Sequence, residues 1–138
     1  MESFTELAQR RYSVRKFDQK PVPPELLEKV LNAVMLAPTA KNYQSQQIIV
    51  AISGEAVGRV RACTQCHFDA PIIMILAYDA ARASVRATDG KNCGEQDIMI
   101  AADHMMLQAA DLGLGTTLVG LYDEKALRRA FPQLQGLT

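Results

Sequence analysis

Three polar residues near the start of the chain alternate in a pattern that could bind phosphate. The stretch RRYSVRKF is rich in β-branched and aromatic residues, which predicts an extended segment. Alternate residues of an extended segment share a face, so Arg11, Ser13 and Arg15 are expected to point the same way. Two guanidinium groups and a hydroxyl on one side would give charge-assisted donors for a phosphate monoester. The alternative is an exposed basic edge whose charges are simply solvated.

A second polar stretch, APTAKNYQ, follows a predicted helix at a proline. It offers the Thr39 hydroxyl, the amides of Asn42 and Gln44, and free backbone groups in a short loop. Such a loop can hydrogen-bond a polar heterocycle, because loops on a rigid scaffold often carry binding residues. The alternative is a plain connecting turn.

The sequence CTQCH matches the C-x-x-C-H motif by which c-type haem is attached, through Cys63, Cys66 and His67. Haem attachment would call for export, and the N-terminal sequence MESFTELAQRR has no apolar core of a secretory signal. A redox disulfide and a zinc half-site are further alternatives, although zinc would lack a fourth ligand at standard spacing. We expect a pair of thiols between a helix and a strand, and no metal site.

The chain is organised around an apolar stretch, residues 97–117, that predicts a buried central helix ending at Gly113. Its few polar residues form one narrow stripe, which consists of Asp97, His104, Gln108 and Asp111. A metal site through His104 and Asp111 is one interpretation of this stripe. We favour the other, in which these groups satisfy one another or cap neighbouring backbone.

The glycines that close this helix, Gly113 and Gly115, could suggest a dinucleotide-binding fingerprint. That fingerprint needs a strand before the glycines and a helix after them, whereas this sequence predicts the reverse order. It is therefore excluded.

The remaining patterns predict a mixture of helices and apolar strands around this helix. Continuous apolar strands are typical of sheets covered on both faces, which favours an α+β fold arranged as an α/β sandwich. The final stretch, FPQLQGLT, resembles the start of another strand. The other expected elements are a helix opened by a Ser3–Glu6 capping box and ending near Arg10, helix 25–36, strand 48–52, helix 54–62, strand 72–78, a charged connection at 79–94, strand 116–122, and helix 124–130 capped by Asp123.

Composition narrows the function classes further. With 138 residues we expect one domain spanning 1–138. The net charge is zero, which gives no support for nucleic-acid binding, and no apolar run reaches the roughly 20 residues that span a bilayer. Three cysteines and no export signal favour a reduced, cytoplasmic location.

Taken together, the motifs resemble the nitroreductase family of FMN enzymes. The resemblance covers almost the whole chain, and it rests on several separated motifs in the family's order. These are RRYSVRKF, PVPPELLEKVLNAVMLAPTAKNYQ, the step Phe68-Asp69-Ala70-Pro71 into a strand, the approach from Gly90 to Glu95-Gln96-Asp97, and the buried helix followed by LGLGTTLVG.

This resemblance implies a nitroreductase-like fold, with a central mixed or antiparallel sheet flanked by helices, in a domain-swapped homodimer. It also implies an FMN site at the subunit interface. The family's phosphate motif falls on Arg11, Ser13 and Arg15; its ring-binding loop, reaching from the partner subunit, falls on Pro38, Thr39, Asn42 and Gln44; and the backbone near the flavin's reactive edge falls on Val119 and Gly120.

The implied activity is an oxidoreductase with a ping-pong mechanism. NAD(P)H would deliver hydride to the flavin N5, leave, and be replaced by an electron-poor acceptor such as a nitroaromatic, a quinone or another flavin. No catalytic side chain is then required, and none is visible. Two departures make an alternative credible, namely a non-catalytic flavin-binding or degenerate dimerisation protein. Ser45 and Gln46 stand where the family has Pro-Trp, and the family's C-terminal strand with its late basic residue is absent from this sequence.

Overall fold

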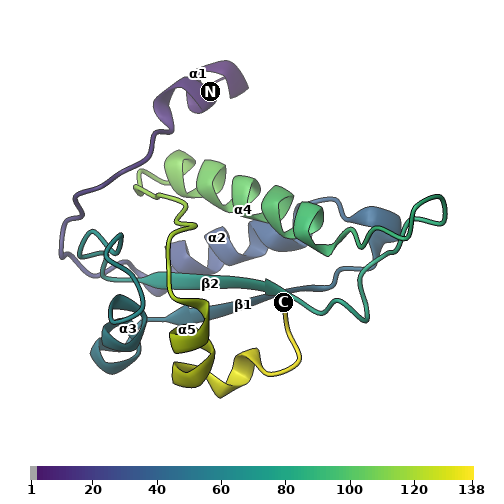
Figure 1. Ribbon diagram of the computed structural model, residues 1–138. Coiled ribbons are helices and arrows are strands. Elements are labelled where there is room, and N and C mark those ends of the chain that lie inside the picture. Colours follow the sequence, from purple (N-terminus) through teal and green to yellow (C-terminus); the bar gives the residue numbers. More distant parts are fainter. Residues whose placement is uncertain (1–2) are drawn as a thin grey trace.

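The computed structural model describes residues 3–138, in which two antiparallel strands form a central sheet (Figure 1). Strand β1 (Gln46–Ala51) pairs with β2 (Ile73–Tyr78), so that Gln46 lies opposite Tyr78. Both strands are the apolar runs that the sequence predicts, and their bounds differ from the expected ones only at the ends.

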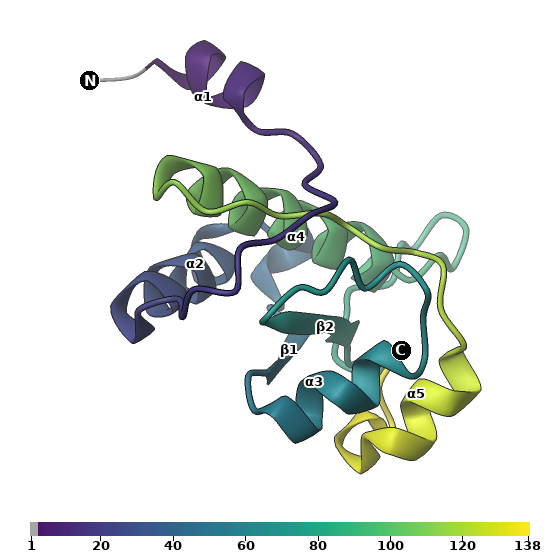
Figure 2. The same cartoon turned by 90° about the vertical axis from the view of Figure 1, so that its left-hand side faces the viewer.

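Helices cover both faces of this sheet, as Figures 1 and 2 show. Helices α2 (Pro24–Leu36) and α4 (Gly94–Asp111) lie on one face. Helices α3 (Gly54–Arg61) and α5 (Glu124–Ala130) lie on the other. The predicted α+β sandwich is confirmed.

The strands contribute side chains to two cores because successive residues of a strand point to opposite faces. Met74 and Leu76 pack against the core of α2 and α4. Ile75 and Ala77 belong to the core of α3 and α5. This double burial explains why the strands are continuous apolar runs rather than alternating ones.

Local capping signals place several helix ends correctly. Helix α1 (Phe4–Arg10) opens with the expected capping box, in which Ser3 N donates to Glu6 Oε2 at 2.7 Å and Glu6 N donates to Ser3 Oγ at 3.3 Å. Helix α5 begins after Asp123, whose Oδ1 accepts from Ala126 N at 2.9 Å. Two short 3-10 turns complete the elements, at Ala40–Asn42 and Pro132–Leu134.

Helix α4 starts earlier than the sequence predicted, and one of its sides is exposed. It begins at Gly94, which packs so tightly on Tyr78 that a Cβ there would lie 2.1 Å from Tyr78 Cδ2. The helix is also not enclosed all round, since Met99 is 44% exposed and Ile100 is 38% exposed. One apolar side of α4 therefore faces outward in a single chain.

The strand expected at residues 116–122 does not form. Only an isolated parallel bridge joins Thr116 to Ser13, and Leu118, Leu121 and Tyr122 are exposed. The prediction was wrong because an apolar run becomes a strand only where it finds a partner strand, and residues 117–122 pair with none among residues 3–138.

Thr138 makes a strand-like pair with Tyr78. Thr138 and Tyr78 exchange two backbone hydrogen bonds, both of 2.9 Å, which is the pattern of an antiparallel hydrogen-bonded pair. The stretch FPQLQGLT otherwise forms the 3-10 turn Pro132–Leu134 and no strand, so only this terminal pair has strand character. Across residues 3–138, no helix is long and apolar enough to cross a membrane.

Candidate functional site

The N-terminal arm, residues 11–20, lies against the segment that follows α4, residues 113–122 (Figure 2). Ser13 forms the parallel bridge with Thr116, and Val14 N donates to Thr116 O at 2.9 Å. The contact is close because Gly115 has no side chain to hold the arm away. Two stretches far apart in the sequence, both part of the expected site, are thus in direct contact.

The three residues of the predicted phosphate motif lie along this arm. Arg11 follows α1 directly, and its N–H donates to Leu7 O at 3.0 Å. Arg11 and Ser13 are partly buried, whereas Arg15 is exposed. Arg15 Nη1 also reaches the Ser13 carbonyl at 3.5 Å. This contact involves the Ser13 backbone and not its hydroxyl, so the shared face for the three side chains stays a prediction.

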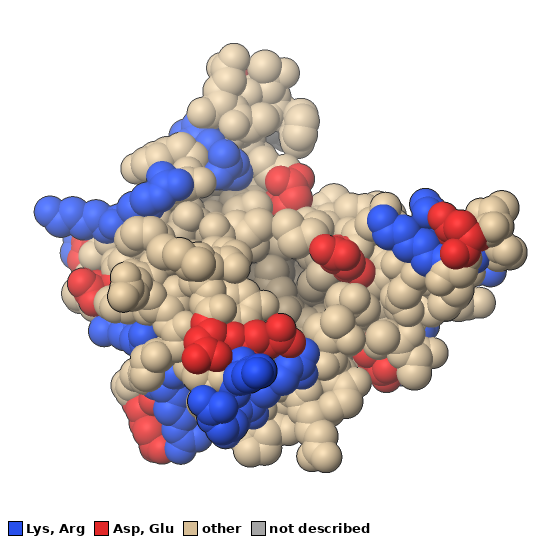
Figure 3. All heavy atoms as spheres, viewed as in Figure 1, with Lys and Arg blue, Asp and Glu red and all other residues tan. Residues whose placement is uncertain are grey.

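A hollow of about 440 Å³ opens beside Arg15. Three of its lining side chains are cationic, those of Arg15, Lys16 and Arg61, and only one lining side chain, that of Asp69, is acidic. Figure 3 shows Lys and Arg side chains gathered on the side of the molecule where the arm passes. The excess of positive charge suits an anion such as a phosphate. The other lining residues are Phe17, Gln19 and Phe68.

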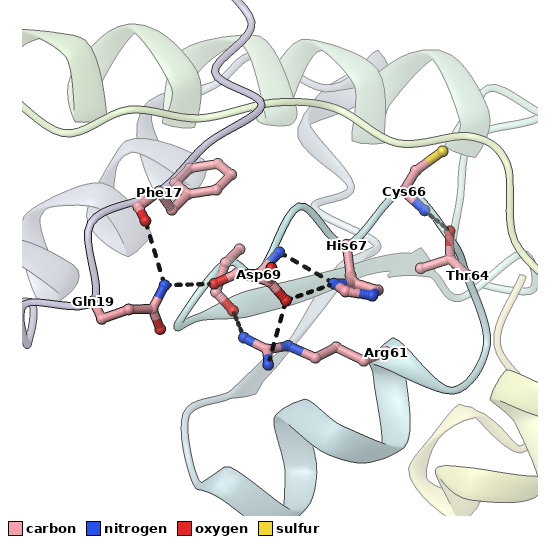
Figure 4. Close-up of polar contacts among 8 residues, drawn as sticks. Phe17, Gln19, Arg61, Thr64, Cys66, His67 and Asp69 are labelled. Carbon is pink, nitrogen blue, oxygen red and sulfur yellow. Dashed lines mark hydrogen bonds and ion pairs between the residues drawn. The ribbon is translucent and has the colours of Figure 1, made fainter.

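Hydrogen bonds from Gln19 and Arg61 fix one wall of this hollow (Figure 4). Gln19 Nε2 donates to the carbonyls of Asp69, at 2.9 Å, and Phe17, at 3.3 Å. Arg61 Nη2 donates to Ala70 O at 3.0 Å, and its Nη1 lies 3.8 Å from Asp69 Oδ1. Sequence reasoning missed Arg61, because at the end of α3 it resembles an ordinary basic helix terminus.

The second predicted element, loop 38–44, has a strained backbone. Lys41, Asn42 and Gln44 have positive φ angles of 54°, 56° and 50°. Left-handed backbone costs a non-glycine residue on the order of 1 kcal/mol, less for Asn, so such conformations persist only where surrounding contacts impose them. Here Gln44 N donates to Thr39 Oγ1 at 3.1 Å, and Asn42 N donates to Thr39 O at 2.9 Å. Pro38, Asn42 and Gln44 are exposed, and Thr39 is partly buried.

Loop 38–44 and the arm lie at opposite ends of α4 within one chain (Figure 1). Ala40 N donates to Asp97 in the first turn of the helix, whereas Arg10 Nη1 donates to the carbonyl of Ala110 in its last turn. At 1.5 Å per residue these two anchor points are about 20 Å apart along the axis. Among residues 3–138, no hydrogen bond or ion pair joins loop 38–44 to residues 11–15.

The third predicted element, around Val119 and Gly120, is an open backbone segment. Both residues have backbone N–H groups with no acceptor in the described part of the chain, residues 3–138. The segment is fastened beyond them, because Thr64 Oγ1 donates to Leu121 O at 2.6 Å and Asp123 N donates to Cys63 O at 2.8 Å. Free N–H groups on a fastened segment can serve a ligand.

Comparison with known proteins settles the family. A family model described as the nitroreductase family matches residues 8–64 and 61–135. The chain belongs to the nitroreductase family. A nitroreductase family protein from Clostridium difficile 630 is 35% identical, with a TM-score of 0.94 over 99% of this chain and 78% of that one.

Two further similar proteins have lower sequence identity to this chain. The FMN-dependent nitroreductase of Clostridium difficile R20291 is 23% identical, with a TM-score of 0.76 over 96% of this chain and 80% of that one, and so shows the fold alone. An NADH dehydrogenase from Thermus thermophilus is 30% identical over 78% of this chain. This chain spans 60%, 78% and 54% of the length of three curated relatives that it matches.

In this nitroreductase-family chain the C-x-x-C-H motif forms no disulfide. Cys63 is 6% exposed, and its Sγ donates to Arg59 O at 3.2 Å. Burial raises the pKa of the Cys63 thiol, and the negative charge of Asp123 adds to the effect. The Cys66 thiol points toward the segment after α4, away from the His67 ring (Figure 4). Within residues 3–138, no group of three or more His, Cys, Asp or Glu side chains is placed to hold a metal ion.

The polar residues of α4 bond to their neighbours, as favoured from the sequence. His104 Nδ1 lies 3.0 Å from Ile100 O, and Gln108 Nε2 donates to Asp111 at 3.4 Å. Asp97 caps backbone as well, but it is only 3% exposed and does not belong to a surface stripe.

Proposed function

We propose that this chain is an FMN-dependent oxidoreductase that carries electrons from NAD(P)H to an electron-poor small molecule, such as a nitroaromatic, a quinone or a flavin. The observation that supports it most is the pairing of the arm with Thr116 beside a cationic hollow. This contact joins the stretch that we propose binds phosphate to the segment that carries Val119 and Gly120, from opposite ends of the sequence.

The residues present fit FMN. Arg11, Ser13 and Arg15 would hold the phosphate, because guanidinium and hydroxyl donors suit a dianionic group. Val119 and Gly120 offer backbone N–H groups that lack an acceptor among residues 3–138, and such donors suit the polar edge of a flavin ring. When bound, FMN supplies the redox chemistry, accepting hydride and passing electrons on. The chain's own part is to bind the cofactor, orient it and admit substrates, which is why no catalytic side chain is assigned.

The proposal includes a homodimer in which each flavin touches both chains. Within one chain, loop 38–44 and Arg10, which directly precedes the arm, bond to α4 at points about 20 Å apart along the helix axis. We propose that the loop therefore serves the flavin of the other chain, as the family resemblance implies. A partner's loop, carrying Pro38, Thr39, Asn42 and Gln44, would complete the site. The outward apolar side of α4 at Met99 and Ile100 supports an interface there, since obligate interfaces are apolar.

A second candidate function is flavin binding without catalysis. Ser45 is fully buried, and the Gln46 side chain donates to Val34 O at 3.3 Å. At the two positions where the family resemblance implies Pro-Trp, this chain therefore has side chains turned into its own packing. The wall that would meet a substrate is changed, which favours this alternative.

Steady-state kinetics with the FMN-loaded protein separates these candidates. We expect oxidation of NADH or NADPH with a quinone or nitroaromatic acceptor, and parallel lines in double-reciprocal plots. Intersecting lines would contradict the ping-pong mechanism. A protein that holds FMN but shows no turnover with either nicotinamide would be the flavin-binding alternative.

The free thiols of Cys63, Cys66 and Cys93 agree with the cytoplasmic location that we propose for this activity.

A further inference from the structure

The Asp97 carboxylate is buried between α4 and loop 38–44. It is 3% exposed, and its Oδ1 accepts from Ala40 N at 2.9 Å. Its Oδ2 is buried and has no hydrogen-bond partner within residues 3–138. A buried carboxylate with one oxygen unpaired is unfavourable for folding, so its presence calls for a reason other than stability.

The one hydrogen bond that the Asp97 side chain makes within residues 3–138 supplies a missing cap. Ala40 begins the 3-10 turn, so its N–H has no acceptor inside that turn. The preceding residue, Thr39, has the extended conformation of an N-cap, yet its hydroxyl does not cap the turn. Thr39 Oγ1 accepts instead from Gln44 N at the far end of the loop. The cap therefore comes from another element, and Thr39 is free to close the loop.

These two bonds hold a backbone that would otherwise relax. Three of the four residues from Lys41 to Gln44 have left-handed φ angles. Thr39 fastens the C-terminal end of this strained loop, and Asp97 fastens its N-terminal end to α4. The helix is a firm support, because Ala101, one turn further along, is completely buried.

We propose that Asp97 is a positioning residue for the flavin ring. It fixes the loop that carries Thr39, Asn42 and Gln44, without itself touching the cofactor. The inference rests on the proposed function and adds a residue to it. A carboxylate suits this role because its charge strengthens the bond to an N–H and is favourable at the N-terminal end of α4.

Flavin titrations of the full-length protein test this inference, with FMN and riboflavin as separate ligands. Asp97→Ala removes the hydrogen-bond acceptor for Ala40 N. We therefore expect it to lower the affinities for FMN and riboflavin by the same factor, tenfold or more. Asp97→Asn keeps an oxygen acceptor and should stay within about threefold of wild type. Equal losses for the two ligands point to the ring, because riboflavin lacks the phosphate that Arg11 and Arg15 would bind. Glu55→Ala, which removes an exposed first-turn carboxylate from α3, is the matched control and should change neither affinity.

A second variant removes the donor and leaves Asp97 intact. Ala40→Pro deletes the N–H, and the turn should accept it because proline is favoured at a first helical position. Thr39 already has φ −128° and ψ 155°, the conformation that proline requires of the preceding residue. We expect Ala40→Pro to lower the affinity for each flavin by the same factor as Asp97→Ala does. Combining the two substitutions should lower the affinity no further.

The outcomes separate this inference from the proposed function. If the wild-type protein binds FMN and the Asp97→Ala and Ala40→Pro variants bind it equally well, the inference is wrong and the proposed function stands. Additive losses in the double variant would also overturn it. If Asp97→Ala fails to fold, Ala40→Pro decides alone. If the wild-type protein binds neither flavin, the proposed function fails, and this inference fails with it.

Discussion

Gly115 lies in direct contact with Val14. A Cβ on Gly115 would be 2.7 Å from Val14 Cγ2, 3.2 Å from its Cβ and 3.3 Å from its Cγ1. The neighbouring residues Ser13 and Thr116 form the bridge that holds the arm. The missing side chain at Gly115 therefore allows the candidate phosphate motif to lie where it does.

Gly115→Ala should move the arm and weaken FMN binding. A Val γ-methyl group has no torsional freedom to retreat far, so the bridge must open. We expect a loss of about tenfold in FMN affinity, equivalent to about 1.4 kcal/mol, measured by fluorescence titration. Combining it with Val14→Ala removes the blocking methyl groups and should restore most of the affinity. An unchanged affinity in the Gly115→Ala single variant would contradict this role of the contact.

Arg15→Glu should abolish flavin retention and leave the protein folded. Arg15 is exposed and forms no ion pair within residues 3–138, so its loss is expected to cost little stability. A carboxylate at this position would repel the phosphate of FMN. The measurement is the flavin content of the purified protein, with circular dichroism as the check on folding. Flavin that copurifies in full would show that this residue does not bind the phosphate.

Two glycine substitutions should shift stability in opposite directions. Gly94→Ala would drive a Cβ into the Tyr78 ring, and overpacking of this kind costs about 1–3 kcal/mol. Gly58, inside α3, has no atom within 4 Å of the position its Cβ would take, so Gly58→Ala should stabilise the protein by about 0.5–1 kcal/mol. Urea denaturation measures both. Equal effects would show that the contact with Tyr78 does not constrain the start of α4.

The two thiols of the C-x-x-C-H motif should differ in reactivity. Burial, aided by the charge of Asp123 and opposed by Arg129, raises the pKa of Cys63 above its usual 9.0, so less thiolate is present at pH 8. We expect iodoacetamide to modify the partly exposed Cys66 first, as mass spectrometry of peptides would show. Because the pKa of Cys63 is raised in the folded protein, burial of its neutral thiol contributes fully to stability below pH 9.0. This contribution is lost as the pH rises through the pKa that Cys63 has in the folded protein. Faster alkylation of Cys63 would contradict its burial.

Local signals predicted those elements whose stability depends on nearby residues. The Ser3–Glu6 capping box and the Asp123 cap consist of hydrogen bonds between residues three positions apart in the sequence. Both are present as expected. The apolar strands were found because their burial on both faces leaves a continuous pattern. The motif order also predicted the family, since several separated motifs rarely agree by chance.

Contacts distant in the sequence could not be predicted in this way. Nothing near residues 116–122 shows that this apolar run lacks a partner strand beyond the bridge at Thr116. Nothing near Asp97 shows that it caps a loop 57 residues away. Arg61 and Lys16 gave no signal, because a basic residue that lines a hollow resembles one on an open surface. The assignment of the flavin-binding residues remains a prediction from the family motif.

The visible absorption spectrum of the purified protein, before and after NADPH is added without oxygen, tests the proposed activity most directly. We expect a flavin spectrum that bleaches on reduction, which requires both the cofactor and hydride transfer. A flavin spectrum that persists with NADPH and also with NADH would leave only the flavin-binding alternative. A colourless protein that does not take up added FMN would contradict the proposed function outright.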